Sequence, residues 1–107
     1  MALKAAFIFL APDVDPQKHR QTVFTPAVEL TAVAVNNYDE AVEVCKALVE
    51  EGIGAFELCG GFGNIGTAMV AEALQSKAAV GVVRFDGHPG LGFKSGDEIF
   101  RAVKVAG

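Results

Sequence analysis

The stretch Gly54-Ala-Phe-Glu-Leu-Cys59 runs directly into Gly60-Gly-Phe-Gly-Asn-Ile-Gly66, and this transition decides the fold class. The first segment is short and mostly apolar, which predicts a buried strand. The second segment contains four glycines and predicts a tight turn. A helix is expected from about Ile65 to Lys77, because its apolar residues have helical spacing. A buried strand that turns into a helix is typical of α/β proteins with parallel sheets.

Three further apolar runs predict the other strands of the sheet, at residues 5–11, 28–35 and 79–85. A second helix is expected before the Gly54–Cys59 strand. Asn37 can cap this helix, Glu40 stands three residues later as in a capping box, and Gly52 can end it.

The order of the elements predicts one α/β domain over residues 1–107, built as a small three-layer sandwich. Its four-stranded, mainly parallel sheet is expected in the strand order 2-1-3-4, flavodoxin-like or half-Rossmann. Residues 12–26 carry three prolines and are interpreted as a long loop. Ser95 and Glu98 form a further capping box, which predicts a short C-terminal helix with Ile99, Phe100 and Val103 on one side.

Composition excludes several classes of partner. The net charge is −4 and the lysines and arginines are scattered, which argues against binding to nucleic acid. No apolar run is long enough to span a membrane. The two cysteines, Cys45 and Cys59, fit a reducing compartment, so we expect a cytoplasmic protein. Hydrophobic residues make up 51% of this short chain, which predicts a homo-oligomer.

The spacing Gly61-x-Gly63-x-x-Gly66, after a strand and before a helix, matches a dinucleotide-binding turn. Three interpretations are open: a tight turn only, a site for phosphate or another anion at the helix N-terminus, and a dinucleotide site with Asp86 on the ribose. The sequence specifies no cofactor. The candidate ligand-binding residues are Gly60, Gly61, Gly63, Asn64, Gly66, Arg84, Asp86 and, if the 12–26 loop folds over the same edge, Arg20.

Cys59 and His88 are the candidate catalytic residues. Cys59 lies near a helix N-terminus, where a thiolate is favoured, and His88 or His19 could act as its base. The alternatives are a packed cysteine and a histidine that only shapes its loop. Arg84 and Asp86 could likewise pair with each other. Two cysteines and two histidines at wide spacing do not predict a metal site.

Glu57 interrupts an otherwise apolar strand. A buried carboxylate needs a partner, and Arg84 on the adjacent predicted strand is a candidate.

The segments Asn36-Asn-Tyr-Asp-Glu-Ala41, Glu57-Leu-Cys-Gly-Gly-Phe-Gly63 and Arg84-Phe-Asp-x-His-Pro-Gly90 resemble a family of short bacterial proteins of unknown function. The resemblance spans nearly the whole chain. It implies a soluble, bacterial, single-domain protein and brings no activity with it. From the residues themselves, we expect a domain that binds an anionic small molecule at the carboxyl edge of the sheet. The alternatives are an enzyme that uses Cys59 or His88, and a structural protein that acts as a homo-oligomer.

Overall fold

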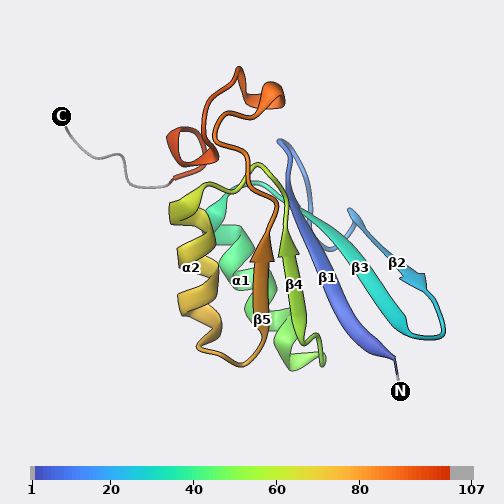
Figure 1. The fold of residues 1–107 in the computed structure, drawn as a ribbon. Coiled ribbons are helices and arrows are strands. Elements are labelled where there is room, and N and C mark those ends of the chain that lie inside the picture. Colours follow the sequence, from blue (N-terminus) through green and yellow to red (C-terminus); the bar gives the residue numbers. More distant parts are fainter. Residues whose placement is uncertain (1, 102–107) are drawn as a thin grey trace.

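The computed structural model describes residues 2–101 of the chain (Figure 1). Within this range the strands are β1 (Leu3–Leu10), β2 (Arg20–Phe24), β3 (Val28–Val35), β4 (Ala55–Leu58) and β5 (Ala79–Val82). The α-helices are α1 (Tyr38–Glu50) and α2 (Asn64–Leu74), and two 3-10 turns, η1 (Pro89–Leu91) and η2 (Gly96–Glu98), follow β5.

The strands form one sheet in the order β2-β3-β1-β4-β5. β3, β1, β4 and β5 are mutually parallel, and they lie in the order predicted for the four expected strands. The prediction of four strands is wrong, because β2 adds a fifth strand, antiparallel to β3, within the segment interpreted as a loop. The hydroxyls of Thr22 and Thr31 hydrogen-bond across this pair at 2.8 Å. The three prolines lie outside β2, so none of them removes a donor from its ladder.

The expected ends of α1 are confirmed. The Asn37 side chain accepts a hydrogen bond from the Glu40 amide at 2.9 Å. The Glu40 carboxylate in turn accepts from the amide of Asn36, one residue before the cap, at 2.8 Å. After the last turn, Gly52 has a φ of 99°, a left-handed conformation that suits glycine.

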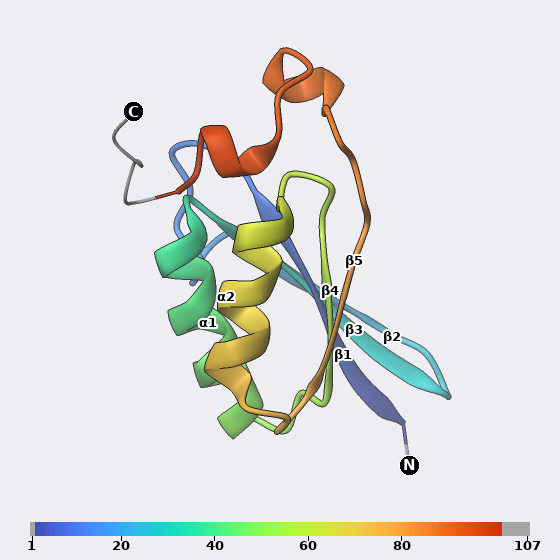
Figure 2. The same ribbon diagram turned by 60° about the vertical axis from the view of Figure 1, so that its left-hand side comes forward.

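Both helices lie on the same face of the sheet, so the molecule has two layers and the prediction of three is wrong (Figure 2). The crossovers from β3 to β4 and from β4 to β5 both move in one direction along the sheet. Right-handed crossovers in one direction place their helices on one face. The connection from β1 to β3 moves the other way, but it contains β2 in place of a helix. The flavodoxin-like assignment, which requires helices on both faces, is not confirmed.

The helix-covered face of the sheet holds the hydrophobic core. Ile8 is fully buried in the middle strand, and its register partners Val33 and Leu58 lie beside it. The helices contribute Tyr38, Ala41, Cys45, Leu48, Val70 and Leu74 to the same core.

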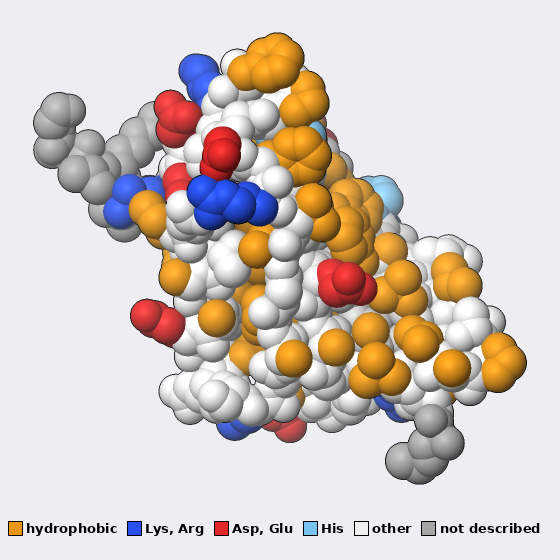
Figure 3. All heavy atoms as spheres, viewed as in Figure 1, with side chains coloured by type: hydrophobic (Ala, Val, Ile, Leu, Met, Phe, Trp, Pro, Cys, Tyr) orange, Lys and Arg blue, Asp and Glu red, His pale blue; other side chains and the backbone are white. Residues whose placement is uncertain are grey.

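The opposite face carries no helix in the described residues, and we call it the open face. Successive residues of a strand point to opposite faces, so the open face follows from the register. Figure 3 shows hydrophobic side chains spread over the sheet on this side. The open face comprises Leu3, Ala5, Phe7, Phe9, Gln21, Val23, Val28, Leu30, Ala32, Ala34, Ala55, Glu57, Ala79 and Gly81.

The capping box at Ser95 and Glu98 is confirmed, with both reciprocal hydrogen bonds present. It opens the three-residue 3-10 turn η2 rather than a longer helix within the described residues. Phe100 packs on the core cluster, and Val103 lies outside the described residues.

Candidate functional site

A hollow of about 190 Å³ lies at the carboxyl edge of the sheet, where three separate segments meet. The turn into α2 forms one wall, the chain that continues from β5 forms another, and the residue before η2 closes the hollow. Figures 1 and 2 show these segments gathered beyond the ends of β4 and β5. The lining residues are Phe62, Gly63, Asn64, Thr67, Val82, Arg84, Phe85, Asp86 and Ser95.

Two glycines of the turn are explained by contacts within the chain. A Cβ added to Gly60 would overlap the ring of Phe85, and a Cβ added to Gly66 would overlap the ring of Tyr38. Both glycines are buried. Close packing against the fully buried Tyr38 therefore requires glycine at position 66 whether or not a ligand binds there, whereas Phe85, the neighbour of Gly60, is 40% exposed and can move.

The N-terminus of α2 holds a carboxylate that belongs to the same chain. Asp97 accepts hydrogen bonds from the amides of Ile65 and Gly66 at 3.1 and 3.2 Å. A Cβ on Gly63 would overlap this carboxylate. The first amides of a helix are free to donate and carry the positive end of its dipole, so an anion is stabilised there. The anion that the structure places there is Asp97.

Tyr38 links Asp97 to the turn. Its hydroxyl donates to Asp97 at 2.8 Å and accepts from the amide of Gly63 at 2.9 Å. The ring is fully buried and stacks on Phe62, with centroids 5.5 Å apart. Burial raises the pKa of Tyr38 well above its usual value, although the Gly63 amide acts in the opposite direction. The hydroxyl thus stays protonated and remains a donor to Asp97.

Arg84 and Asp86 form the charged wall of the hollow. They pair at 2.8 Å, and their side chains are 65% and 85% exposed. Arg84 also donates to the side-chain oxygen of Asn64, at the start of α2, at 3.2 Å. From the sequence, pairing between Arg84 and Asp86 was an alternative to ligand binding, and this pair is present. A pair this exposed contributes little stability, roughly 0–1 kcal/mol.

Glu57 does not pair with Arg84 in the structure. Its side chain is exposed on the open face, so it needs no buried partner within this chain.

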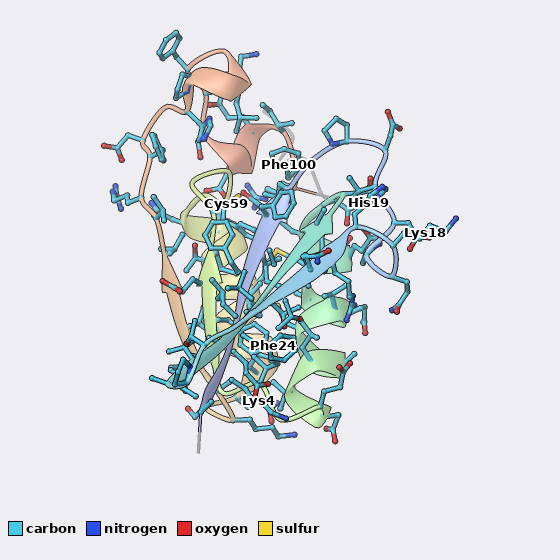
Figure 4. The ribbon with its side chains drawn as sticks, turned by 90° about the vertical axis from the view of Figure 1, so that its right-hand side faces the viewer. Lys4, Lys18, His19, Phe24, Cys59 and Phe100 are labelled. Atoms are coloured by element: carbon cyan, nitrogen blue, oxygen red, sulfur yellow. The ribbon has the colours of Figure 1, made fainter. Side chains whose placement is uncertain are left out.

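Cys59 lies at the end of β4, where its sulfur accepts from the amides of Leu10 and Gly61 at 3.4 and 3.3 Å. Neither histidine forms a hydrogen bond with Cys59 in the described residues. His19 and His88 each accept a backbone amide of their own loop through Nδ1. Figure 4 shows Cys59 near the end of the sheet and His19 at the start of β2. The catalytic role of Cys59 and His88 stays a prediction.

Arg20 is not brought to the hollow. It is the first residue of β2, at the edge of the sheet opposite β5, and its Nε donates to the carbonyl of Pro16 at 2.8 Å. The segment before β2 therefore does not place Arg20 beside Arg84.

Several residues of the site were missed by reasoning from the sequence. Asp97 and Tyr38 are separated by 59 residues, and no local pattern connects them to the turn. The signal that could have found Asp97 is its place inside the Ser95–Glu98 capping box, a segment already expected to be ordered. The lining residues Phe62, Thr67, Val82 and Phe85 also had no distinguishing pattern, and Ser95 was expected only as a helix cap.

Two kinds of feature are absent from the described residues. Within residues 2–101, no three His, Cys, Asp or Glu side chains are grouped so that they could hold a metal ion. None of the helices in this range has the length and the apolar run that a membrane span requires.

Comparison with known proteins yields one family. A family model described as "Family of unknown function (DUF6506)" matches residues 3–98, most of the chain. No curated protein and no solved structure gives a significant match. The bacterial origin implied by the resemblance stays a prediction. The chain belongs to the DUF6506 family of unknown function.

Proposed function

We propose that this domain binds a small anion-bearing molecule, a phosphate or a short carboxylate, in the hollow beside Arg84. The supporting observation is that one hollow is lined by candidate residues from two separate segments of the sequence, Gly63 and Asn64 from one and Arg84 and Asp86 from the other. The hollow lies outside the carboxyl ends of parallel strands, where α/β sheets usually bind ligands.

Arg84 is the group we assign to the anion. A guanidinium has five N–H donors. The hydrogen bonds to Asn64 and Asp86 use one donor on each terminal nitrogen and fix the direction of the side chain. The remaining donors are available to a bidentate phosphate or carboxylate.

The α2 amides have a different role in this proposal. Because Asp97 accepts from Ile65 and Gly66, a bound anion is expected at Arg84 and not at the helix N-terminus. Asn64 and Thr67, on the exposed side of the same helix turn, are close enough to line the hollow and contact the rest of the ligand.

The volume of the hollow restricts the ligand. Sites for drug-sized ligands usually enclose about 300–1,000 Å³, whereas this hollow encloses about 190 Å³. A phosphate or a carboxylate of a few carbon atoms fits inside the hollow, whereas a dinucleotide would extend beyond it. Asp86 is negatively charged and pairs with Arg84, so it competes with the anion for that guanidinium.

A titration followed by ¹⁵N NMR tests the proposal. Inorganic phosphate and succinate are added in turn, and the amide shifts of residues 62–67 and 82–86 are followed. We expect saturable shifts in these segments. Arg84→Gln should weaken binding at least about tenfold, the loss of one charge-assisted pair. Asp86→Asn should tighten binding a few-fold, because it removes the competing carboxylate.

Arg20→Gln is the matched control, since it removes an arginine at the opposite edge of the sheet. It should leave the titration unchanged. Saturation that is insensitive to Arg84→Gln, or shifts confined to other segments, would show that the hollow does not bind the anion.

A further inference from the structure

The segment that follows β5, residues 83–100, is built as a unit of its own, and we call it the latch. Its tip is closed by an isolated bridge between His88 and Lys94, and η1 lies between these two residues. η2 has its own capping box. Figures 1 and 2 show the latch rising from β5 beyond the sheet and returning to the start of α2. The latch therefore has two attachments, one at β5 and one at α2.

Few hydrogen bonds join the latch to the rest of the domain. The amide of Val83 donates to the carbonyl of Leu58 at 2.9 Å, which continues the pairing of β5 with β4. Beyond Val83, no bond between two backbone groups joins the latch to the rest of the described chain. One side-chain bond runs from Arg84 to Asn64, and the three others converge on the carboxylate of Asp97. The polar attachment at α2 therefore depends on Asp97.

Close packing completes the attachment at α2. The ring of Phe100 lies against the ring of Tyr38, with centroids 6.2 Å apart, and packs on the core cluster. Gly96 is buried, and a Cβ at this position would overlap the carbonyl of Gly61. At the tip of the latch, in contrast, Phe93 is 76% exposed. The latch is thus docked through η2 and Phe100 and not through its tip.

The hollow is lined partly by the latch and partly by the rest of the domain. The latch contributes Arg84, Phe85, Asp86 and Ser95, and the remaining lining residues come from β5, the turn and α2. Ser95 is two residues from Asp97, and its side-chain oxygen accepts from the Asp97 amide at 3.2 Å. The hydroxyl proton of Ser95 is not used in any hydrogen bond within the described residues, so it is available to an anion in the hollow. Release of η2 from α2 would withdraw Ser95 and open the hollow on that side.

We propose that Asp97 is a positioning residue for the anion site: it docks η2 on the first turn of α2 and so closes the latch over the hollow, and an anion bound beside Arg84 in turn holds the latch closed. This inference rests on the proposed function. The coupling acts in both directions, because a ligand that binds the closed form more tightly shifts the latch toward that form. Asp97, Tyr38 and Phe100 do not line the hollow, yet they decide how often it is complete.

Hydrogen exchange of the Ile65 and Gly66 amides, measured on the full chain, reports on the latch. Both amides donate to Asp97, and amides in the first turn of a helix have no partner within that helix. They therefore exchange when Asp97 leaves. With inorganic phosphate at ten times its Kd, their exchange should slow about tenfold, because binding to the closed form alone divides the open fraction by 1 + [L]/Kd. The amides of β2, which open locally at the opposite edge of the sheet, should keep their rates.

Phe100→Ala and Phe93→Ala form a matched pair that changes no charge. Both remove a phenyl ring from the latch, but only Phe100 packs on the core cluster. Phe100→Ala should speed the exchange of the Ile65 and Gly66 amides at least about tenfold, because a buried apolar contact is lost from the docked form. Phe93→Ala should leave both rates unchanged. Circular dichroism checks folding, and Asp97→Asn, which weakens the bonds from both amides, supplies the result if Phe100→Ala does not fold.

The outcomes separate this inference from the proposed function. Phosphate that binds at Arg84 without slowing exchange at Ile65 and Gly66 would overturn the coupling and leave the proposed function standing, since a merely structural helix cap does not respond to phosphate. Phosphate that gives no saturable shifts would overturn the proposed function and the coupling with it. Equal acceleration by Phe100→Ala and Phe93→Ala would show that docking on the core does not hold the latch closed.

Discussion

The two faces of the sheet are built from the same strands and both carry many apolar side chains, yet in the described residues only one of them forms a closed core. On the covered face Ile8 and Leu58 have no exposed surface. On the open face their chain neighbours Phe7 and Phe9 are only half-buried, and Glu57 is exposed. Composition alone does not distinguish the faces. The direction of the crossovers distinguishes the faces, because it places both helices on one side of the sheet.

The difference predicts how much stability each face contributes. A residue of the covered face is enclosed by other residues of the core, whereas a residue of the open face keeps part of its surface in solvent. The following substitutions compare the two, from the largest expected effect to the smallest.

Ile8→Ala and Phe7→Ala compare adjacent residues on opposite faces. Ile8→Ala should lower the free energy of unfolding by about 2–5 kcal/mol, because it leaves a cavity in the core. The loss from Phe7→Ala should be smaller, because Phe7 is only half-buried and its removal leaves no enclosed cavity. Urea unfolding measures both losses, and an equal or larger loss for Phe7→Ala would contradict the comparison.

Gly66→Ala and Gly54→Ala compare a packed glycine with an open one. The added methyl group at Gly66 overlaps the Tyr38 ring, and the strain should cost about 1–3 kcal/mol. A Cβ on Gly54 meets nothing within 4 Å. Thermal unfolding should therefore show a lower midpoint for Gly66→Ala and little change for Gly54→Ala. Similar midpoints for the two variants would mean that the turn tolerates a side chain.

Cys45 gives the covered face a pH dependence. Burial raises the pKa of this thiol to about 12, whereas an unfolded thiol ionises near pH ~8.5. Because the folded-state pKa is raised, the thiol's contribution is complete below pH ~8.5 and is lost as the pH rises toward 12. The expected slope is about 1.4 kcal/mol per pH unit.

Unfolding measured from pH 8.5 to 10 in a Cys59→Ala background isolates this slope, since Tyr38, the single tyrosine, ionises in the unfolded chain only near pH ~10. Cys45→Ala in the same background should flatten it. A slope that survives Cys45→Ala would assign the alkaline loss to another group.

Much of the fold could be predicted because the signals were local. The strand over residues 28–35, the Asn37 cap and Gly52 are short patterns whose physical meaning does not depend on distant residues. β2 was missed because Arg20–Phe24 is brief and lies between prolines. The number of layers was missed because an apolar strand face fits a helix and a second sheet equally well.

For the candidate site, sequence patterns could predict which loops line the hollow, but not which distant residues contact those loops. Gly63, Asn64, Arg84 and Asp86 line the same hollow, as a parallel sheet requires of loops at its carboxyl edge. The Gly61-x-Gly63-x-x-Gly66 spacing indicated an anion at the helix but not which anion. Asp97 comes from a segment 31 residues beyond Gly66, and only the tertiary fold brings the two together.

The Asp97 contact also decides what a shortened chain would lack. Within the described residues, every strand and both α-helices lie before residue 83. A chain cut after residue 90 would keep all of these elements but lose the carboxylate that accepts from the amides of Ile65 and Gly66. Gly63, the N-cap residue of α2, makes no side-chain cap bond that could replace it. The first turn of α2 would then depend on solvent to satisfy its amides.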